Sequence, residues 1–173
     1  VKLLHANTVM GQFVTSLKNT ARWQLSSSML HGFMGTIQSA YGYAQDLNKS
    51  LNSIRIVTGQ SAEQMDAFAQ RANKAAKALS TTTTAYTDAA LIFYQQGLGD
   101  KEVEERTNAV IKMSNVTGDS ATEVSSYMTA IWNNFDDGSK SLEHYGDILT
   151  ALGAATASSS KEIAGGLEQF SSI

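Results

Sequence analysis

The sequence predicts an all-α fold, with one long amphipathic N-terminal helix followed by a compact bundle of about five or six shorter helices. The chain has 173 residues and no proline, so any segment can be helical without losing a backbone hydrogen-bond donor. Apolar residues make up 42% of the chain, enough to form a core, and they recur at helical spacing. The β-prone run at residues 81–84 is too short and polar to pair as a strand.

The predicted long helix is the N-terminal element. Apolar residues between Met10 and Ile54 recur about every 3.7 residues, close to the 11-residue repeat of a straight or slightly right-handed seam. Such a helix would be about 65 Å long, so we expect part of its apolar stripe to contact another chain. The alternative is that the stripe packs on helices of its own chain. The predicted self-association residues are Met10, Phe13, Leu17, Leu25, Met29 and Phe33.

Two similar strings punctuate the chain, because residues 57–62 and 116–121 both read Val-Thr-Gly-x-Ser-Ala. Gly59 and Gly118 are the predicted helix stops, since glycine readily takes the left-handed conformation that closes a helix. Each serine is followed three residues later by Gln or Glu, the spacing of a capping box. The flanking helices do not match well. We therefore interpret the strings as independent helix boundaries, with a duplicated helical unit as the alternative.

The same signals predict the shorter helices at about 61–79, 84–96, 100–116, 120–135 and 140–155, with a last helix that begins at 159. They divide the chain into residues 1–58, a self-association arm, and residues 59–173, a helical bundle module. Short breaks between such helices are typical of antiparallel neighbours in a bundle. The expected core comprises Met65, Phe68, Ala72, Leu79, Leu91, Phe93, Tyr94, Val103, Val110, Met113, Val124, Met128, Ile131, Trp132, Phe135, Leu142, Tyr145, Leu149, Leu152, Ile163 and Leu167.

Within that core, Met128, Trp132 and Phe135 are the predicted structural anchors. They are spaced by four and three residues and so share one face of a helix. Trp132 is the largest of the three, so we expect its burial to contribute most to the stability of the bundle.

The charges are unevenly placed. Residues 1–60 hold five basic residues and one acidic residue, a net charge of +4, and the remainder holds eight basic and fifteen acidic residues, a net charge of −7. The basic part could lie near an acidic protein surface, but five dispersed cations make a poor phosphate-binding patch, so no specific nucleic acid is expected as a partner. No apolar run reaches the roughly 18 residues needed to span a bilayer. The chain begins at Val1 rather than at a methionine, and we expect it to be a piece of a larger polypeptide.

The sequence offers no pattern for catalysis, and we predict a protein that is not an enzyme and has no catalytic, cofactor-binding or metal site. There is no cysteine, and His5, His31 and His144 stand in no metal-ligand pattern. The carboxylates at 102, 104 and 105 fall in the first turn of a predicted helix, where the helix dipole favours acids. Their expected role is therefore structural rather than hydrolytic.

Four segments of the chain carry a family resemblance. The longest is residues 132–160, which read WNNFDDGSKSLEHYGDILTALGAATASSS. Upstream are residues 55–64, RIVTGQSAEQ, and residues 84–97, TAYTDAALIFYQQG; downstream are residues 162–168, EIAGGLE. In this order the segments resemble the core region of tailed-phage tape measure proteins.

The resemblance implies a structural protein that occupies the lumen of a phage tail, sets tail length during assembly and is released ahead of the DNA during infection. It implies a homotrimer, and as partners the tail tube, distal tail or baseplate proteins, the tail assembly chaperones and, on ejection, the host membrane. The implied location is the tail lumen or tail tip of the virion, and the host cytoplasm during assembly. Some members carry peptidoglycan hydrolase modules, but this chain has no such motif.

Two other classes of function stay open. The first is a membrane-active helical protein that inserts into the host envelope during genome delivery, which a liposome-leakage assay would distinguish from a purely structural tape. The second is a helical adaptor or a secreted helical-hairpin protein. The Trp-x-Gly turn of one such secreted family is absent, because Trp23 precedes Gln-Leu and Trp132 precedes Asn-Asn.

Overall fold

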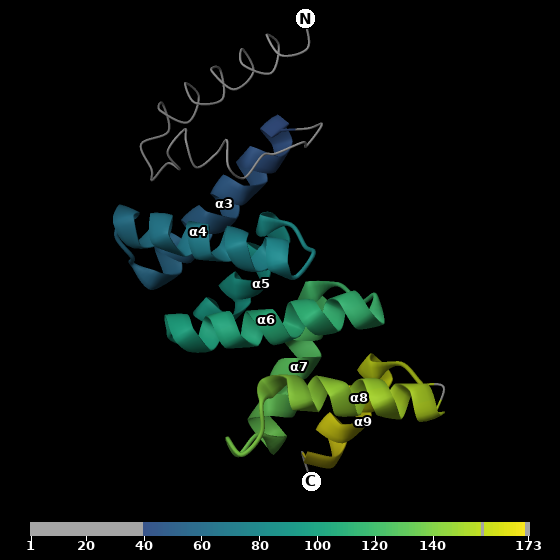
Figure 1. The fold of residues 1–173 in the computed structure, drawn as a ribbon. Helices are drawn as coiled ribbons and strands as arrows, with labels where there is room; N and C mark the ends of the chain where they lie inside the picture. The colour runs from purple at the N-terminus through teal and green to yellow at the C-terminus, as the bar shows by residue number, and fades with distance from the viewer. Residues whose placement is uncertain (1–39, 157, 172–173) are drawn as a thin grey trace, which may run out of the picture. The chain divides into compact units, whose positions relative to one another are not determined.

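The described part of the protein is entirely helical. A computed structural model describes residues 40–156 and 158–171, and within these ranges the chain forms seven α-helices and no strand (Figure 1). The all-α class is thereby confirmed for the described residues. The predicted self-association residues, from Met10 to Phe33, lie outside them. The full length of the N-terminal helix and its association with another chain stay predictions.

The chain divides into two compact units, Val1–Thr87 and Asp88–Ile173, and the division falls within α5 (Thr83–Gln95). In the first unit, α3 (Ala40–Thr58) packs against α4 (Ala62–Ala78). The hydroxyl of Thr83 donates a hydrogen bond of 3.0 Å to the side-chain oxygen of Asn73, which ties the start of α5 to α4. The predicted arm of residues 1–58 lies largely outside the described residues, so the domain boundary at residue 58 stays a prediction.

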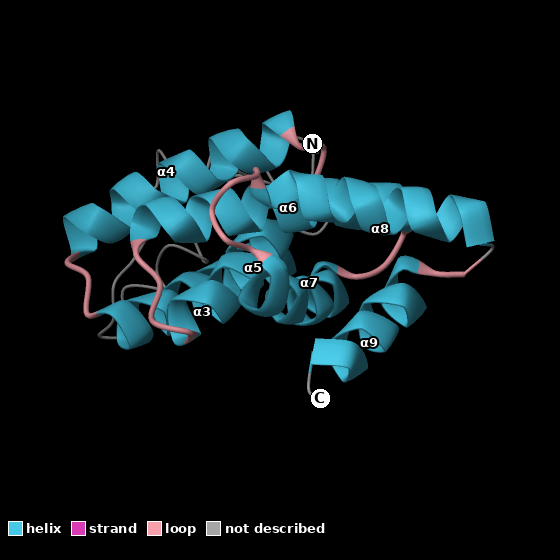
Figure 2. Cartoon of the chain, turned by 90° about the horizontal axis from the view of Figure 1, so that it is seen from below, coloured by secondary structure: helices cyan, strands magenta, loops and turns pink. Residues whose placement is uncertain are grey.

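The second unit contains α6 (Asp100–Thr117), α7 (Ala121–Phe135), α8 (Leu142–Thr156) and α9 (Ser160–Ser171). Within this unit α6 and α8 form one layer, and α7 and α9 form the other (Figure 2). Helix α7 contacts the other three, and α8 also contacts α6 and α9. All the predicted short helices are present, with observed bounds within two residues of the predicted ones.

Trp132 lies in the core of the second unit. Its side chain is 2% exposed, and Met128, one turn earlier on α7, is also buried. The indole N–H donates a hydrogen bond of 3.1 Å to the carbonyl oxygen of Leu142, so the one polar group of this buried ring has a partner. The guanidinium of Arg106 lies 5.0 Å from the ring centroid, and the ring of Phe93 lies 6.1 Å away. Trp132 therefore joins α5, α6, α7 and the start of α8.

The prediction that Phe135 is a core residue was wrong, because its side chain is 44% exposed. Phe135 is the last residue of α7, where the chain turns away and no further helical turn covers the ring. Leu152, also expected in the core, is 41% exposed on α8. Six other expected core residues are only half-buried: Leu79, Leu91, Leu142, Tyr145, Ile163 and Leu167. The buried residues that were not among the expected core residues include the large side chains Tyr86, Ile111 and Tyr127.

Both predicted helix stops have left-handed backbone geometry. Gly59 has φ +69° and Gly118 has φ +79°. The N–H of each donates to the carbonyl oxygen four residues earlier, at 2.8 Å for Gly59 and 2.9 Å for Gly118. The following helices, α4 and α7, each begin with a complete capping box. The short breaks between helices in the described chain are thus local structures with their own hydrogen bonds.

Candidate functional site

An open apolar groove of about 350 Å³ lies between α6 and α8 in the second unit. Its α6 wall consists of Ala109, Lys112, Met113 and Val116, and its α8 wall extends from Leu142 to Ala154. The buried side chain of Met128 on α7 also lines it. Val116 on the α6 wall is 69% exposed, and it lies beside the other apolar residues of the groove. The groove therefore leaves apolar surface open to a binding partner.

Gly146 of α8 faces the side chain of Met113 on α6. A Cβ atom built on Gly146 would lie 3.2 Å from the sulfur of Met113, closer than ordinary van der Waals contact. Only glycine allows this approach without displacing the methionine. Farther along the α8 wall the side chains are again small, since Ala151 and Ala154 follow. The small side chains make the groove a shallow channel rather than a filled helix-helix interface.

Charged groups border the groove. The ammonium group of Lys112 donates a hydrogen bond of 3.0 Å to a carboxylate oxygen of Glu143, which bridges α6 and α8. This bond holds the pKa of Glu143 below its ordinary value. Asp147, one turn farther along α8, is exposed and makes no hydrogen bond or ion pair with the residues that the structure describes. The rim thus offers one uncompensated negative charge beside an apolar channel.

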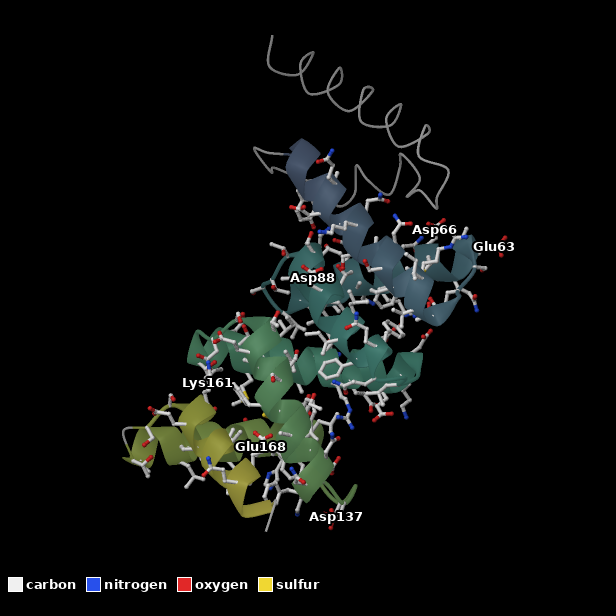
Figure 3. All side chains as sticks on the ribbon, turned by 180° about the vertical axis from the view of Figure 1, so that it is seen from behind. Glu63, Asp66, Asp88, Asp137, Lys161 and Glu168 are labelled. Atoms are coloured by element: carbon white, nitrogen blue, oxygen red, sulfur yellow. The ribbon has the colours of Figure 1, made fainter. Side chains whose placement is uncertain are left out.

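Helices α7 and α9, which form the layer behind the groove, are joined to each other by a side-chain contact. Lys161 lies at the start of α9 (Figure 3). Its ammonium group donates a hydrogen bond of 2.9 Å to Glu123 at the start of α7. This contact, with the capping bond from Ser120, lowers the pKa of Glu123. At the other end of α7 the Tyr145 hydroxyl lies 3.1 Å from the Phe135 carbonyl oxygen and closes the connection to α8. Both contacts fix α7, which supports Met128 at the groove.

The groups considered for chemistry do not assemble into a site. The side chain of Arg106 donates to Glu102 at 3.0 Å within α6, and Glu105 lies 3.8 Å from Lys101 on the surface. His144 is exposed, and its ring lies edge-on to Tyr145 at 5.9 Å. No group of three or more potential metal ligands occurs among the described residues. Within the same residues, no helix is long and apolar enough to cross a membrane.

The groove was not foreseen from the sequence. Its residues carry a weak signal, because Gly146, Thr150 and Ala154 recur at four-residue spacing and so give α8 one face of small side chains. Such a face is equally typical of close packing inside a bundle. Only the pairing of α8 with α6 shows that part of this face stays open. The predicted self-association residues from Met10 to Phe33 lie outside the described residues, so their relation to the groove is not part of the observed structure.

A comparison with protein families decides the class of the protein. The family model of phage-related minor tail proteins matches residues 73–173, which include the last turns of α4 and all of α5 to α9. The chain belongs to this family. No curated protein matches the chain. No solved structure matches it either.

Family membership makes the chain a structural protein of a phage tail, located in the tail of the virion. The matched region contains the whole groove between α6 and α8. In a tail component, an open apolar channel with a charged rim has the chemistry of a protein-protein contact.

Proposed function

We propose that the protein is a tail tape measure protein, which occupies the tail lumen, sets tail length during assembly and leaves ahead of the DNA during infection. The family match over residues 73–173 carries this proposal, together with the resemblance of residues 132–160 to the core of tape measure proteins. The proposed partners are other copies of the chain, as a homotrimer, the tail tube, distal tail or baseplate proteins and the assembly chaperones.

The described helices indicate which part of such a protein this region forms. The longest helix within residues 59–173, α6, has 18 residues and so measures only about 27 Å. Glycines with positive φ at 59, 97, 118 and 138 interrupt the helices at short intervals. A ruler requires a continuous rise per residue, which these breaks prevent. The proposal therefore assigns residues 59–173 to a folded module attached to the tape, and length measurement to continuous helix elsewhere.

Deletions in the phage gene test this assignment. Removing 22 residues, two 11-residue repeats, from residues 1–58 keeps the predicted seam in register and should shorten the tail by roughly 33 Å where this helix lies along the tube. Removing the same number within residues 100–135 should abolish tail assembly, because it deletes the core helices α6 and α7. Tail lengths counted by electron microscopy give the result. Viable phage with normal tails after both deletions would exclude the tape measure role.

A further inference from the structure

We propose that the groove between α6 and α8 receives the segment Leu17–Met29 of a second copy of this chain. The proposal is independent of the tape measure role, because it concerns only how copies of the chain associate. It joins two features that are otherwise unconnected: an open apolar channel in the second unit, and a predicted amphipathic segment in the sequence.

The dimensions of the two partners agree. The α8 wall from Leu142 to Ala154 spans twelve helical steps, about 18 Å. Leu17, Ala21, Leu25 and Met29 recur every four residues, and a helix from Leu17 to Met29 spans the same twelve steps. A row of side chains at four-residue spacing forms a ridge, and ridges of this kind pack into grooves between helical side chains. The segment thus matches the groove in length and in pattern.

The charges of the two partners are complementary. Residues 1–45 contain three basic residues and no acidic residue, and two of the three, Lys18 and Arg22, flank the apolar row at Leu17 and Ala21. Residues 88–173, which form the groove, hold five basic and thirteen acidic residues, a net charge of −8. Asp147 on the rim has no partner among the described residues. In the proposed complex Lys18 or Arg22 pairs with Asp147 while the apolar row covers the channel.

A second copy is the natural source of the segment, because every chain carries one segment and one groove. The contact is heterologous, since the two partners present different surfaces. Repeated from copy to copy, it closes into a ring or continues as a linear array. The contact therefore gives an ordered assembly without any further component.

Disulfide trapping tests the geometry, and the absence of cysteine in the chain makes the result unambiguous. One batch of full-length chain carries Leu25→Cys and a second carries Ala154→Cys, which lines the groove. The matched control is Ala155→Cys, an exposed neighbour on α8 that does not line the groove. Mixed under mild oxidation, the first pair should form a disulfide-linked dimer at least about tenfold faster than the control pair, since α-helical neighbours point about 100° apart.

Equal rates for Ala154→Cys and Ala155→Cys would overturn the proposal. So would a chain carrying both Leu25→Cys and Ala154→Cys that closes within itself and stays monomeric. A third overturning result would be wild-type chain that is monomeric at high concentration by light scattering, because no copy would then occupy the groove.

Charge exchange tests the partner chemistry. Asp147→Arg alone, and Lys18→Glu with Arg22→Glu, should each weaken self-association about tenfold in dissociation constant at low salt, and combining them in one chain should restore it. Asp147 is exposed on α8, so circular dichroism should stay unchanged in the Asp147→Arg variant. Failure of the combined variant to recover association would show that these charges do not face each other.

Discussion

The two Val-Thr-Gly junctions share one local structure in two different units of the chain. At both, a threonine hydroxyl donates to the carbonyl four residues earlier, at 2.8 Å for Thr58 and 3.1 Å for Thr117. At both, the same hydroxyl accepts from the N–H two residues later, at 3.3 Å and 3.2 Å. The left-handed glycine and the serine capping box follow in each case. Eight residues of sequence, 57–64 and 116–123, therefore suffice to specify how one helix stops and the next begins.

The junctions differ in how they are connected to other helices. At the second junction Glu123 of the capping box pairs with Lys161 of α9, whereas the first junction has the uncharged Gln64 in that place. Asp119 also accepts a hydrogen bond of 3.2 Å from the Tyr127 hydroxyl. Burial and the charge of Asp119 raise the pKa of Tyr127 to about 12. The two junctions thus form the same local cap, and the residue three positions after the serine decides whether that cap also pairs with α9.

The largest expected effect concerns α7, the helix that follows the second junction. It tests how much the buried residue Trp132 contributes to the free energy of unfolding. Trp132→Ala should lower the free energy of unfolding by about 3–5 kcal/mol, because a fully buried aromatic ring leaves a cavity. Phe135→Ala on the same helix is the control, since this ring is 44% exposed and its loss should cost about 0.5 kcal/mol. Urea titration monitored by circular dichroism gives both values. Equal costs would mean that α7 is held by both residues alike.

The next effect tests whether the two glycines are equivalent. Gly59→Val and Gly118→Val should each destabilise the surrounding unit by about 1–2 kcal/mol, because a β-branched residue is strained in left-handed geometry. Neither position has an atom within 4 Å of a built Cβ, so backbone strain is the expected cause at both. Amide hydrogen exchange in α4 and α7 reports each unit separately.

Gly165→Ala is the control for these two substitutions. Gly165 lies inside α9 with open space around it, so alanine there should be neutral or stabilising. A destabilising Gly165→Ala together with a neutral Gly118→Val would show that the helix boundaries are misplaced.

A smaller effect on stability distinguishes the helix cap at Ser61 from the helix cap at Ser120. Ser61→Ala and Ser120→Ala should each cost about 1 kcal/mol through loss of the capping bond to the third helical residue. We expect a coupling energy between Ser120→Ala and Lys161→Met in a double-mutant cycle, because both residues bond to Glu123. The matched cycle of Ser61→Ala with Lys161→Met should show no coupling. Coupling of similar size in both cycles would remove the difference between the junctions.

The smallest effect is a pH dependence confined to the second junction. The pKa of Glu123 is lowered from 4.5, first by Lys161 and then by Ser120, so the ionised form stabilises the fold. This contribution is present above pH 4.5 and is lost as the pH falls through the lowered pKa of the folded state. Glu123→Gln should therefore reduce stability near neutral pH and lose its effect in acid. A wild-type advantage that persists at about pH 2 would place the stabilisation elsewhere.

Much of the fold follows from local chemistry and is readable from the sequence. The short helices from α4 to α9 begin and end within two residues of their predicted bounds, because glycine stops and serine caps act over only a few residues. The alternation of buried and exposed positions was also mostly readable, as for Met128 and Trp132. The prediction of burial failed at Phe135. This residue continues the helical spacing of Met128 and Trp132, but it is the last residue of α7 and its side chain is 44% exposed.

The sequence by itself determined the helical class, the positions of the helix boundaries and the opposite net charges of the two ends, since each depends on residues close together in the chain. Tertiary structure alone decided that Gly146 meets Met113, that Lys112 reaches Glu143 and that Lys161 completes the cap at Glu123. These contacts join residues about 30 to 40 positions apart, which no helical periodicity encodes. The open groove between α6 and α8 could not be predicted for the same reason, because its lining residues come from helices that are far apart in the sequence.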